Sequence, residues 1–125
     1  MDQSEIASIR ALLGSKPRPV GWTKRRRRLD EIVSIWPLAD DVTLTAGDIN
    51  RIPGEWSTVP GSDRSRVLLF LHGSGYRSGS ILRHRRMVSE AGRAAGVRTL
   101  ALGYRLAPEH PFPAVFDDAL RRGAF

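Results

Sequence analysis

The sequence contains no cysteine, which excludes disulfide bonds, thiolate metal sites and a cysteine nucleophile, and fits a reducing, cytoplasmic location. Long apolar runs are also missing. The longest, at residues 67–71, is far shorter than the roughly 20 residues that a membrane-spanning helix requires. The first residues are acidic and lack the apolar segment of a secretory signal. With 125 residues, 41% of them apolar and 26% charged, the chain suffices for one small globular domain.

Acidic residues are few compared with basic ones, at 13 against 20, and the formal net charge is +7. Such a balance is compatible with a nucleic-acid partner. The densest basic run, residues 24–28 (KRRRR), is followed directly by Asp30 and Glu31 and contains no interleaved aromatic residue. We therefore interpret this run as a solvated helix face paired with those carboxylates. A nucleic-acid-binding domain is kept as a remote alternative, and no nucleic-acid partner is expected.

The first half of the sequence predicts helices and then short strands. Apolar residues recur at helical spacing in two segments, and Ser4 and Thr23 stand where N-caps are expected. The predicted elements are helices at 4–13 and 23–36, strands at 41–46 and around 55–59, and turns at 47–48 and 60–63.

The second half predicts an alternation of strands and helices. Its elements are strands at 67–71 and 97–102, a helix at 81–95 closed by Gly96, and a further helix at 114–122. Residues 67–71 are a continuous apolar run and residues 97–102 are mainly apolar, and we expect both strands to be buried on both faces. In the first of these helices, we expect Leu82, Met87, Val88 and Ala91 to face inward. The βαβα order favours a parallel sheet that is covered by helices.

The segment His72-Gly73-Ser74-Gly75-Tyr76 joins the first buried strand to the following helix. The backbone N–H groups of adjacent small residues can face one concavity and hold an anion there. Ligands of open α/β folds bind at the carboxyl ends of strands, which is where this segment lies. The alternative is an ordinary strand-to-helix turn, in which glycine only satisfies the backbone geometry.

A second segment, residues 104–114 (YRLAPEHPFPA), is by itself a proline-stiffened turn with an expected ion pair between Arg105 and Glu109. It follows the HGSGY segment by one helix and one strand. Together the two segments resemble the hormone-sensitive-lipase-like branch of the α/β-hydrolases, the bacterial esterases with an HGGG loop. The resemblance is strong over residues 67–120 and weak before them.

This resemblance implies a fold class and a division of the chain. The fold is the N-terminal part of an α/β-hydrolase, a mainly parallel sheet flanked by helices with N-terminal cap helices. Residues 1–38 would form the helical cap segment. Residues 39–125 would form the first strands and helices of a domain that is incomplete at its C-terminus.

The resemblance also implies roles for particular residues. Carried over from the family, Gly73 and Ser74 supply backbone N–H donors to an oxyanion hole, and Gly75 gives the loop its shape. His72 and Tyr76 position the loop. Ser74 departs from the family pattern, which usually has glycine at this position. No metal or organic cofactor is implied.

The family's nucleophile lies in a G-x-S-x-G motif, and this motif does not occur in the 125 residues. The triad residues follow the oxyanion loop in α/β-hydrolases, so we expect the chain to lack nucleophile, acid and base. The expected activity is hydrolysis of small carboxylic esters or lactones by acyl transfer to serine. The contexts of residues 54–56 and 79–80 favour the lactone-opening members. An inactive remnant or interaction module is the alternative, and a full-length form could be a homo-oligomer.

Overall fold

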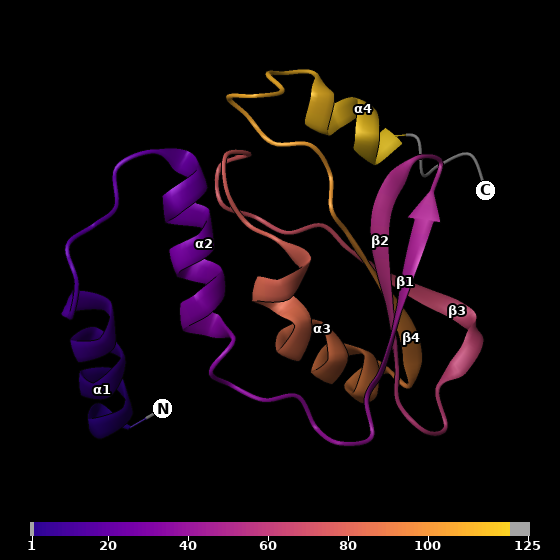
Figure 1. Cartoon of the computed structure of the whole chain (residues 1–125). Coiled ribbons are helices and arrows are strands. Elements are labelled where there is room, and N and C mark those ends of the chain that lie inside the picture. Colours follow the sequence, from indigo (N-terminus) through magenta and orange to yellow (C-terminus); the bar gives the residue numbers. More distant parts are fainter. Residues whose placement is uncertain (1, 121–125) are drawn as a thin grey trace.

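The computed structural model describes residues 2–120 and contains one four-stranded sheet with four helices (Figure 1). The elements are α1 (Gln3–Gly14), α2 (Trp22–Val33), β1 (Thr43–Ile49), β2 (Ile52–Thr58), β3 (Asp63–Phe70), α3 (Ile81–Ala95), β4 (Val97–Leu102) and α4 (Ala114–Leu120). The strand order is β1-β2-β4-β3. β3 and β4 are parallel, whereas β1–β2 and β2–β4 are antiparallel. The predicted βαβ unit is confirmed, and the sheet formed by these four strands is mixed.

The first three helices lie in succession beside the sheet (Figure 1). α3 packs against β4 and β2, α2 lies outside α3, and α1 is the outermost element. α3 approaches β4 closely at Gly92, where an added Cβ would lie 2.6 Å from Thr99 Cγ2. The division at residue 38 stays a prediction, with α1 and α2 before it and the sheet after it.

β4 forms the centre of the sheet, and all of its residues except Arg98 are buried. The largest buried side chains include Leu100 and Leu102 on this strand. A cluster of Ile52, Leu102 and Tyr104 is covered further by Leu106 and Val115. The core therefore runs from β2 through β4 to α4, and the prediction that residues 97–102 are buried is confirmed.

β3 differs from the prediction because only one of its faces is covered. Phe70 faces α3, and its ring centroid lies 5.4 Å from that of His84. Val67, Leu69 and Leu71 alternate with the covered residues and are 44–45% exposed. The expectation that this strand is buried on both faces is wrong for the described residues, because β3 is an edge strand and no described element packs on its second face.

Helix and turn boundaries also shift from the predicted positions. Asp2, not Ser4, caps α1, because its carboxylate accepts from the Glu5 N–H at 2.8 Å and Glu5 reaches back in a capping box. Gly21 precedes α2 without a side-chain cap, so Thr23 is not its N-cap. Residues 47–48 lie within β1. The hairpin turn is at Asn50 and Arg51, both with positive φ, as a two-residue hairpin requires.

The predicted helix at 81–95 is confirmed, and Gly96 closes it with φ of 67°. Leu82 and Met87, which were expected to face inward, are 49% and 52% exposed. Val88 is the apolar side chain of this helix that is buried most deeply. α4 ends at Leu120 among the described residues, and the predicted extension to residue 122 lies outside them.

Candidate functional site

The segment singled out by the sequence forms a loop, residues 72–80, between the end of β3 and the start of α3. Ser74, Gly75 and Tyr76 have φ of 86°, 63° and 62°, three successive residues in the left-handed region. Residues 73–77 are exposed to solvent. Consecutive backbone N–H groups in turn conformations of this kind form concavities that hold anions. The loop lies at the carboxyl end of a sheet strand, where the sequence predicts the oxyanion hole, and that role stays a prediction.

Ser74 adopts this conformation although it carries a Cβ. A non-glycine residue in the left-handed region costs on the order of 1–2 kcal/mol. Its hydroxyl accepts a long hydrogen bond of 3.4 Å from Arg83 Nη1. Among the described residues, neither a histidine nor a carboxylate is hydrogen-bonded to this hydroxyl, so Ser74 is not part of a nucleophile–base pair.

His72 is buried at the base of the loop, only 5% exposed. Its ring stacks on that of Tyr104, with centroids 4.2 Å apart, and His84 stacks on it at 6.1 Å. Its Nδ1 lies 3.0 Å from the Gly73 carbonyl, and the Tyr104 hydroxyl donates to the carbonyl of His72 itself. His72 thus bonds to the loop backbone, and its buried ring is enclosed by aromatic neighbours.

Burial is the largest influence on the pKa values of the three stacked rings, His72, His84 and Tyr104. It lowers the pKa of His72 below its ordinary value of 6.5, outweighing the opposing hydrogen bond to Gly73, and the charge of Arg83 lowers it further. Burial likewise lowers the pKa of His84, followed by the effects of His72 and Arg83. Burial raises the pKa of Tyr104. The stack is therefore neutral near pH 7.

Gly79 is required by this arrangement. It has φ of 98°, and a Cβ placed on it would lie 2.2 Å from His72 Nδ1. Contacts that short do not occur, so any side chain at this position would displace the histidine ring or the loop. The sequence alone did not identify this residue as part of the site, because its role depends on a contact seven residues away.

A polar network beneath the loop connects it to α2 and α3. Ser80 caps α3, accepting from the Arg83 N–H at 3.1 Å, and its hydroxyl donates to Asp30 of α2 at 2.7 Å. Arg83 Nε lies 3.5 Å from the same carboxylate. Its Nη1 reaches the hydroxyls of Ser74 and Ser78. Asp30 and Arg83 cannot be assigned to the site from the sequence, because they come from separate helices.

The proline-rich segment 104–113 lies against the loop. The Ala107 N–H donates to the Tyr76 carbonyl at 2.8 Å. The expected Arg105–Glu109 pair does not form. Arg105 instead binds Asp118 of α4, a side chain only 3% exposed, and Glu109 pairs with Arg26. The predicted pair is wrong for both residues, because closeness in sequence does not specify which elements pack together.

The basic run 24–28 is not the solvated face that its sequence indicates. Arg25 donates to the Pro19 carbonyl, and Arg28 donates to the carbonyls of Leu13, Lys16 and Pro17. These bonds hold the connection between α1 and α2. Arg26 reaches the loop itself, whereas Lys24 and Arg27 are exposed. The predicted pairing with Asp30 and Glu31 is wrong, because most of the run caps backbone carbonyls.

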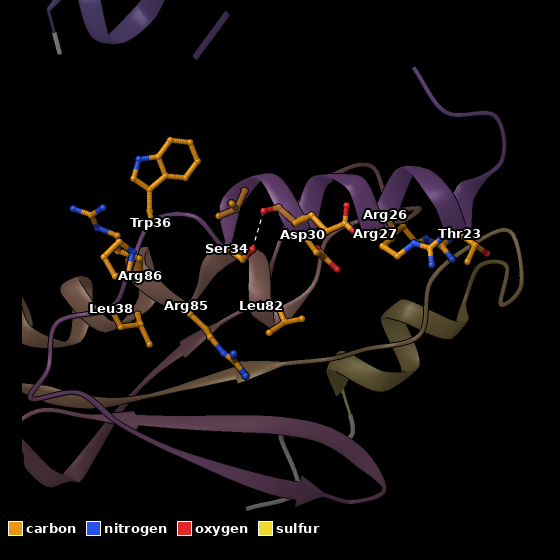
Figure 2. A pocket seen from close by; sticks show the side chains of 13 residues that line it. Thr23, Arg26, Arg27, Asp30, Ser34, Trp36, Leu38, Leu82, Arg85 and Arg86 are labelled. Carbon is orange, nitrogen blue, oxygen red and sulfur yellow. Dashed lines mark hydrogen bonds between the residues drawn. The ribbon is translucent and has the colours of Figure 1, made fainter. Parts of the chain in front are cut away.

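A hollow of about 650 Å³ lies between α2 and α3 (Figure 2). Trp36, Leu38 and Leu82 contribute apolar surface to it, and Arg85 points toward the sheet, where it binds Glu55 at 2.7 Å. Residues 72–80 do not line it. The hollow is therefore separate from the loop of residues 72–80.

Two further observations concern the described residues. Within residues 2–120, no helix is both long and apolar enough to cross a membrane. In the same range, histidine and carboxylate side chains do not gather in groups of three or more that could hold a metal ion.

Comparisons with known proteins define the class. Residues 68–122 match a family profile described as an alpha/beta hydrolase fold. Over 83 residues the chain is 44% identical to an acetyl-hydrolase from Streptomyces hygroscopicus, an alignment covering 59% of this chain and 28% of that protein. It is 40% identical over 83 residues to an ethyl acetate hydrolase from Pseudomonas putida, covering 64% of this chain and 26% of that protein. The chain thus has the N-terminal part of an α/β-hydrolase fold.

Within the α/β-hydrolases, the solved structures that superpose on this chain include bacterial esterases. A crystal structure of an esterase from the bacterial hormone-sensitive lipase family superposes with a TM-score of 0.88 at 36% identity, covering 98% of this chain and 42% of that one. An esterase/lipase from an uncultured bacterium gives a TM-score of 0.83 at 35% identity, with coverage of 98% and 42%. The chain is related to the hormone-sensitive-lipase-like esterases, as its sequence predicted. It spans about a quarter of the length of the curated relatives and about two fifths of the solved ones.

Proposed function

We propose that the protein to which this chain belongs hydrolyses small carboxylic esters by acyl transfer to serine, and that this chain supplies the oxyanion loop. The observation that carries the proposal is the left-handed run of residues 74–76 at the carboxyl end of β3. The relatives' names, acetyl-hydrolase and ethyl acetate hydrolase, support short acyl esters as the substrate class.

In this proposal the N–H groups of Gly73 and Ser74 stabilise the oxyanion of the tetrahedral intermediate. Such a donor is worth on the order of 3–4 kcal/mol in the transition state. Gly75 and Tyr76 keep the loop in its left-handed shape, and His72 fixes the loop at its base. The nucleophile, acid and base would come from chain outside these 125 residues, which contain no G-x-S-x-G motif.

Lactones are the second substrate class to be tested. The sequence context of residues 54–56 suggested them, but Glu55 there binds Arg85, and Arg98 lies over the Trp56 ring at 4.2 Å. These contacts account for both side chains without a substrate. Acyclic esters are therefore the preferred class.

The test compares the 125-residue chain with a longer form that includes a serine motif, using p-nitrophenyl acetate and δ-valerolactone. We expect the chain alone to remain at the protein-free background and the longer form to turn over the acetate ester faster than the lactone. In the longer form, Ser74→Pro removes the donor N–H and should lower kcat by roughly 10²–10³. Ser74→Gly keeps that N–H and should change kcat by less than about tenfold.

Two results would contradict the proposal. Wild-type kinetics in a Ser74→Pro variant with an unchanged circular dichroism spectrum would remove the loop from the mechanism. Turnover by the chain alone that disappears in Ser74→Ala would show that Ser74 is itself a nucleophile. If the longer form hydrolyses neither substrate, the inactive remnant becomes the better interpretation.

A further inference from the structure

Arg26 of α2 connects three segments that are far apart in the sequence. Its Nε donates to the Arg77 carbonyl at 2.7 Å, and its Nη2 donates to the Ala107 carbonyl at 2.7 Å and to Glu109 Oε2 at 3.0 Å. These three bonds use all the protons of Nε and Nη2. The side chain is 20% exposed. A single guanidinium therefore holds the oxyanion loop and the proline-rich segment to the same helix.

The loop needs such support from outside. Ser74 and Tyr76 lie in the left-handed region, which disfavours residues with a Cβ and persists only where the surroundings impose it. The internal bonds of the loop are long, since the N–H groups of Arg77 and Ser78 reach the Ser74 carbonyl at 3.4 and 3.3 Å. The short bonds on this stretch of backbone come from other elements, from Ala107 to the Tyr76 carbonyl and from Arg26 to the Arg77 carbonyl.

The guanidinium shape suits this task better than a simple positive charge would. Its planar edge presents donors in a fixed fork, so that two carbonyls from different loops are bound at once. The same hydrogen bond with Arg26 lowers the pKa of the Glu109 carboxyl below its ordinary value of 4.5. The side chain of Arg27, the next residue, is exposed and makes no hydrogen bond or ion pair with any residue between 2 and 120.

We propose that Arg26 is a positioning residue that holds the oxyanion loop in its anion-binding shape, so that this shape depends on α2 being docked against the loop. The helix thus acts on the reaction through the backbone of residues 76 and 77 and does not touch substrate through Arg26. The kinetic part of this proposal rests on the proposed function, and the structural part does not.

The test uses amide hydrogen exchange measured by NMR on the 125-residue chain carrying Leu69→Lys, a substitution on the exposed face of β3 that opposes self-association. In this background the parent is compared with Arg26→Ala, Arg26→Lys and the matched control Arg27→Ala. We expect Arg26→Ala to accelerate exchange at Arg77, Ser78 and Ala107 about tenfold and to leave Leu100 in β4 unchanged. Arg27→Ala removes the same charge one position away and should alter none of these amides. Arg26→Lys keeps the charge without the fork and should give an intermediate acceleration. In Arg26→Ala, the pKa of Glu109 should rise toward its ordinary value.

Equal exchange in Arg26→Ala and Arg27→Ala would overturn the proposal. So would acceleration at Leu100 equal to that in the loop, in both Arg26 variants, because Arg26 would then support the whole fold and not the loop. In an active longer form, Arg26→Ala should lower kcat about tenfold with KM within a few-fold, and Arg26→Lys should recover part of it. An inactive longer form would contradict the proposed function while leaving the exchange result intact.

Discussion

Gly79 shows how closely the loop and His72 are fitted at the level of one residue. A Cβ at Gly79 would lie 2.2 Å from His72 Nδ1, whereas a Cβ at Gly61, which also has positive φ, would meet nothing within 4 Å. The two positions therefore share the backbone cost of a side chain, but only Gly79 adds a steric clash. This pair separates the two effects in one protein.

We expect Gly79→Ala to lower the free energy of unfolding by about 2–4 kcal/mol, combining overpacking with the left-handed backbone. Gly61→Ala should cost only about 1 kcal/mol, from the backbone alone. Denaturant unfolding of both variants measures the difference. Equal losses in the two would mean that the His72 ring moves aside freely.

The buried His72 and the half-buried His84 give the protein a predictable response to acid. Both have a pKa below 6.5 in the folded chain, because burial favours the neutral ring. An unfolded histidine takes up a proton near pH 6.5, so below that pH the unfolded state binds more protons and stability falls. The loss begins near pH 6.5 and continues until the folded-state pKa is passed.

The expected result is a lower melting temperature at pH 5 than at pH 7.5. Carboxylates with lowered pKa, such as Asp63 and Glu109, lose their contribution only at more acidic pH, so this window isolates the histidines. His84→Gln should reduce the difference between the two pH values, and the exposed His110→Gln should not. An unchanged pH dependence in His84→Gln would contradict this assignment.

At the scale of an element, α1 tests which residue starts a helix. Asp2 accepts the Glu5 N–H, whereas the Ser4 hydroxyl donates to Asp2 Oδ1 at 2.6 Å. Removing an N-cap costs about 1 kcal/mol, so Asp2→Ala should speed amide exchange in α1 about fivefold. Ser4→Ala keeps the cap and should have a smaller effect. The reverse order of effects would restore Ser4 as the N-cap.

The sequence predicted elements better than it predicted their partners. The periodicity of residues 81–95 and the glycine after them defined α3 correctly, because a helix is specified by local spacing and by its cap. The sequence predicts a turn at 47–48, but the turn residues are Asn50 and Arg51, and Gly47 lies within β1 opposite Gly54 of β2. Most of the helices and strands can therefore be predicted from such local signals.

The parts of the site that depend on long-range contacts were not predictable. A glycine-rich loop after a strand indicated where an anion could bind, but the residues that hold it, Asp30, Arg83 and Tyr104, come from three separate elements. The basic run 24–28 was misread for the same reason, since its acceptors are backbone carbonyls that no sequence pattern marks. The position of the loop can therefore be predicted from neighbouring residues in the sequence, whereas the residues that hold it can be identified only once the packing is known.

For the whole molecule, the uncovered apolar face of β3, called here the open face, is the feature most expected to cause association between chains. Val67, Leu69 and Leu71 are exposed on an edge strand whose outer side pairs with no described strand. Apolar edge strands promote association between chains. We expect the isolated 125-residue chain to be poorly stable and to self-associate at micromolar concentration. Whether a full-length form is a homo-oligomer stays a prediction.

Sedimentation velocity of the chain tests this expectation. Leu69→Lys places a charge on the open face and should shift the distribution toward monomer. Leu13→Lys, at an equally exposed position on α1, should leave it unchanged. A monomeric wild type with a sharp cooperative melt would show that these 125 residues form a complete and self-sufficient domain.

The strand order also determines when each strand can pair while the chain is being synthesised on the ribosome. β1 and β2 are neighbours in sequence and can pair as soon as both have been made, whereas the strand that pairs with β3 among residues 2–120 is β4, which is made later. At about 5–20 residues per second, β3 waits one or more seconds for β4 to emerge. β4 must then insert between β2 and β3, joining a finished hairpin to a waiting strand in one step. The nascent chain therefore carries its apolar β3 unpaired through that interval.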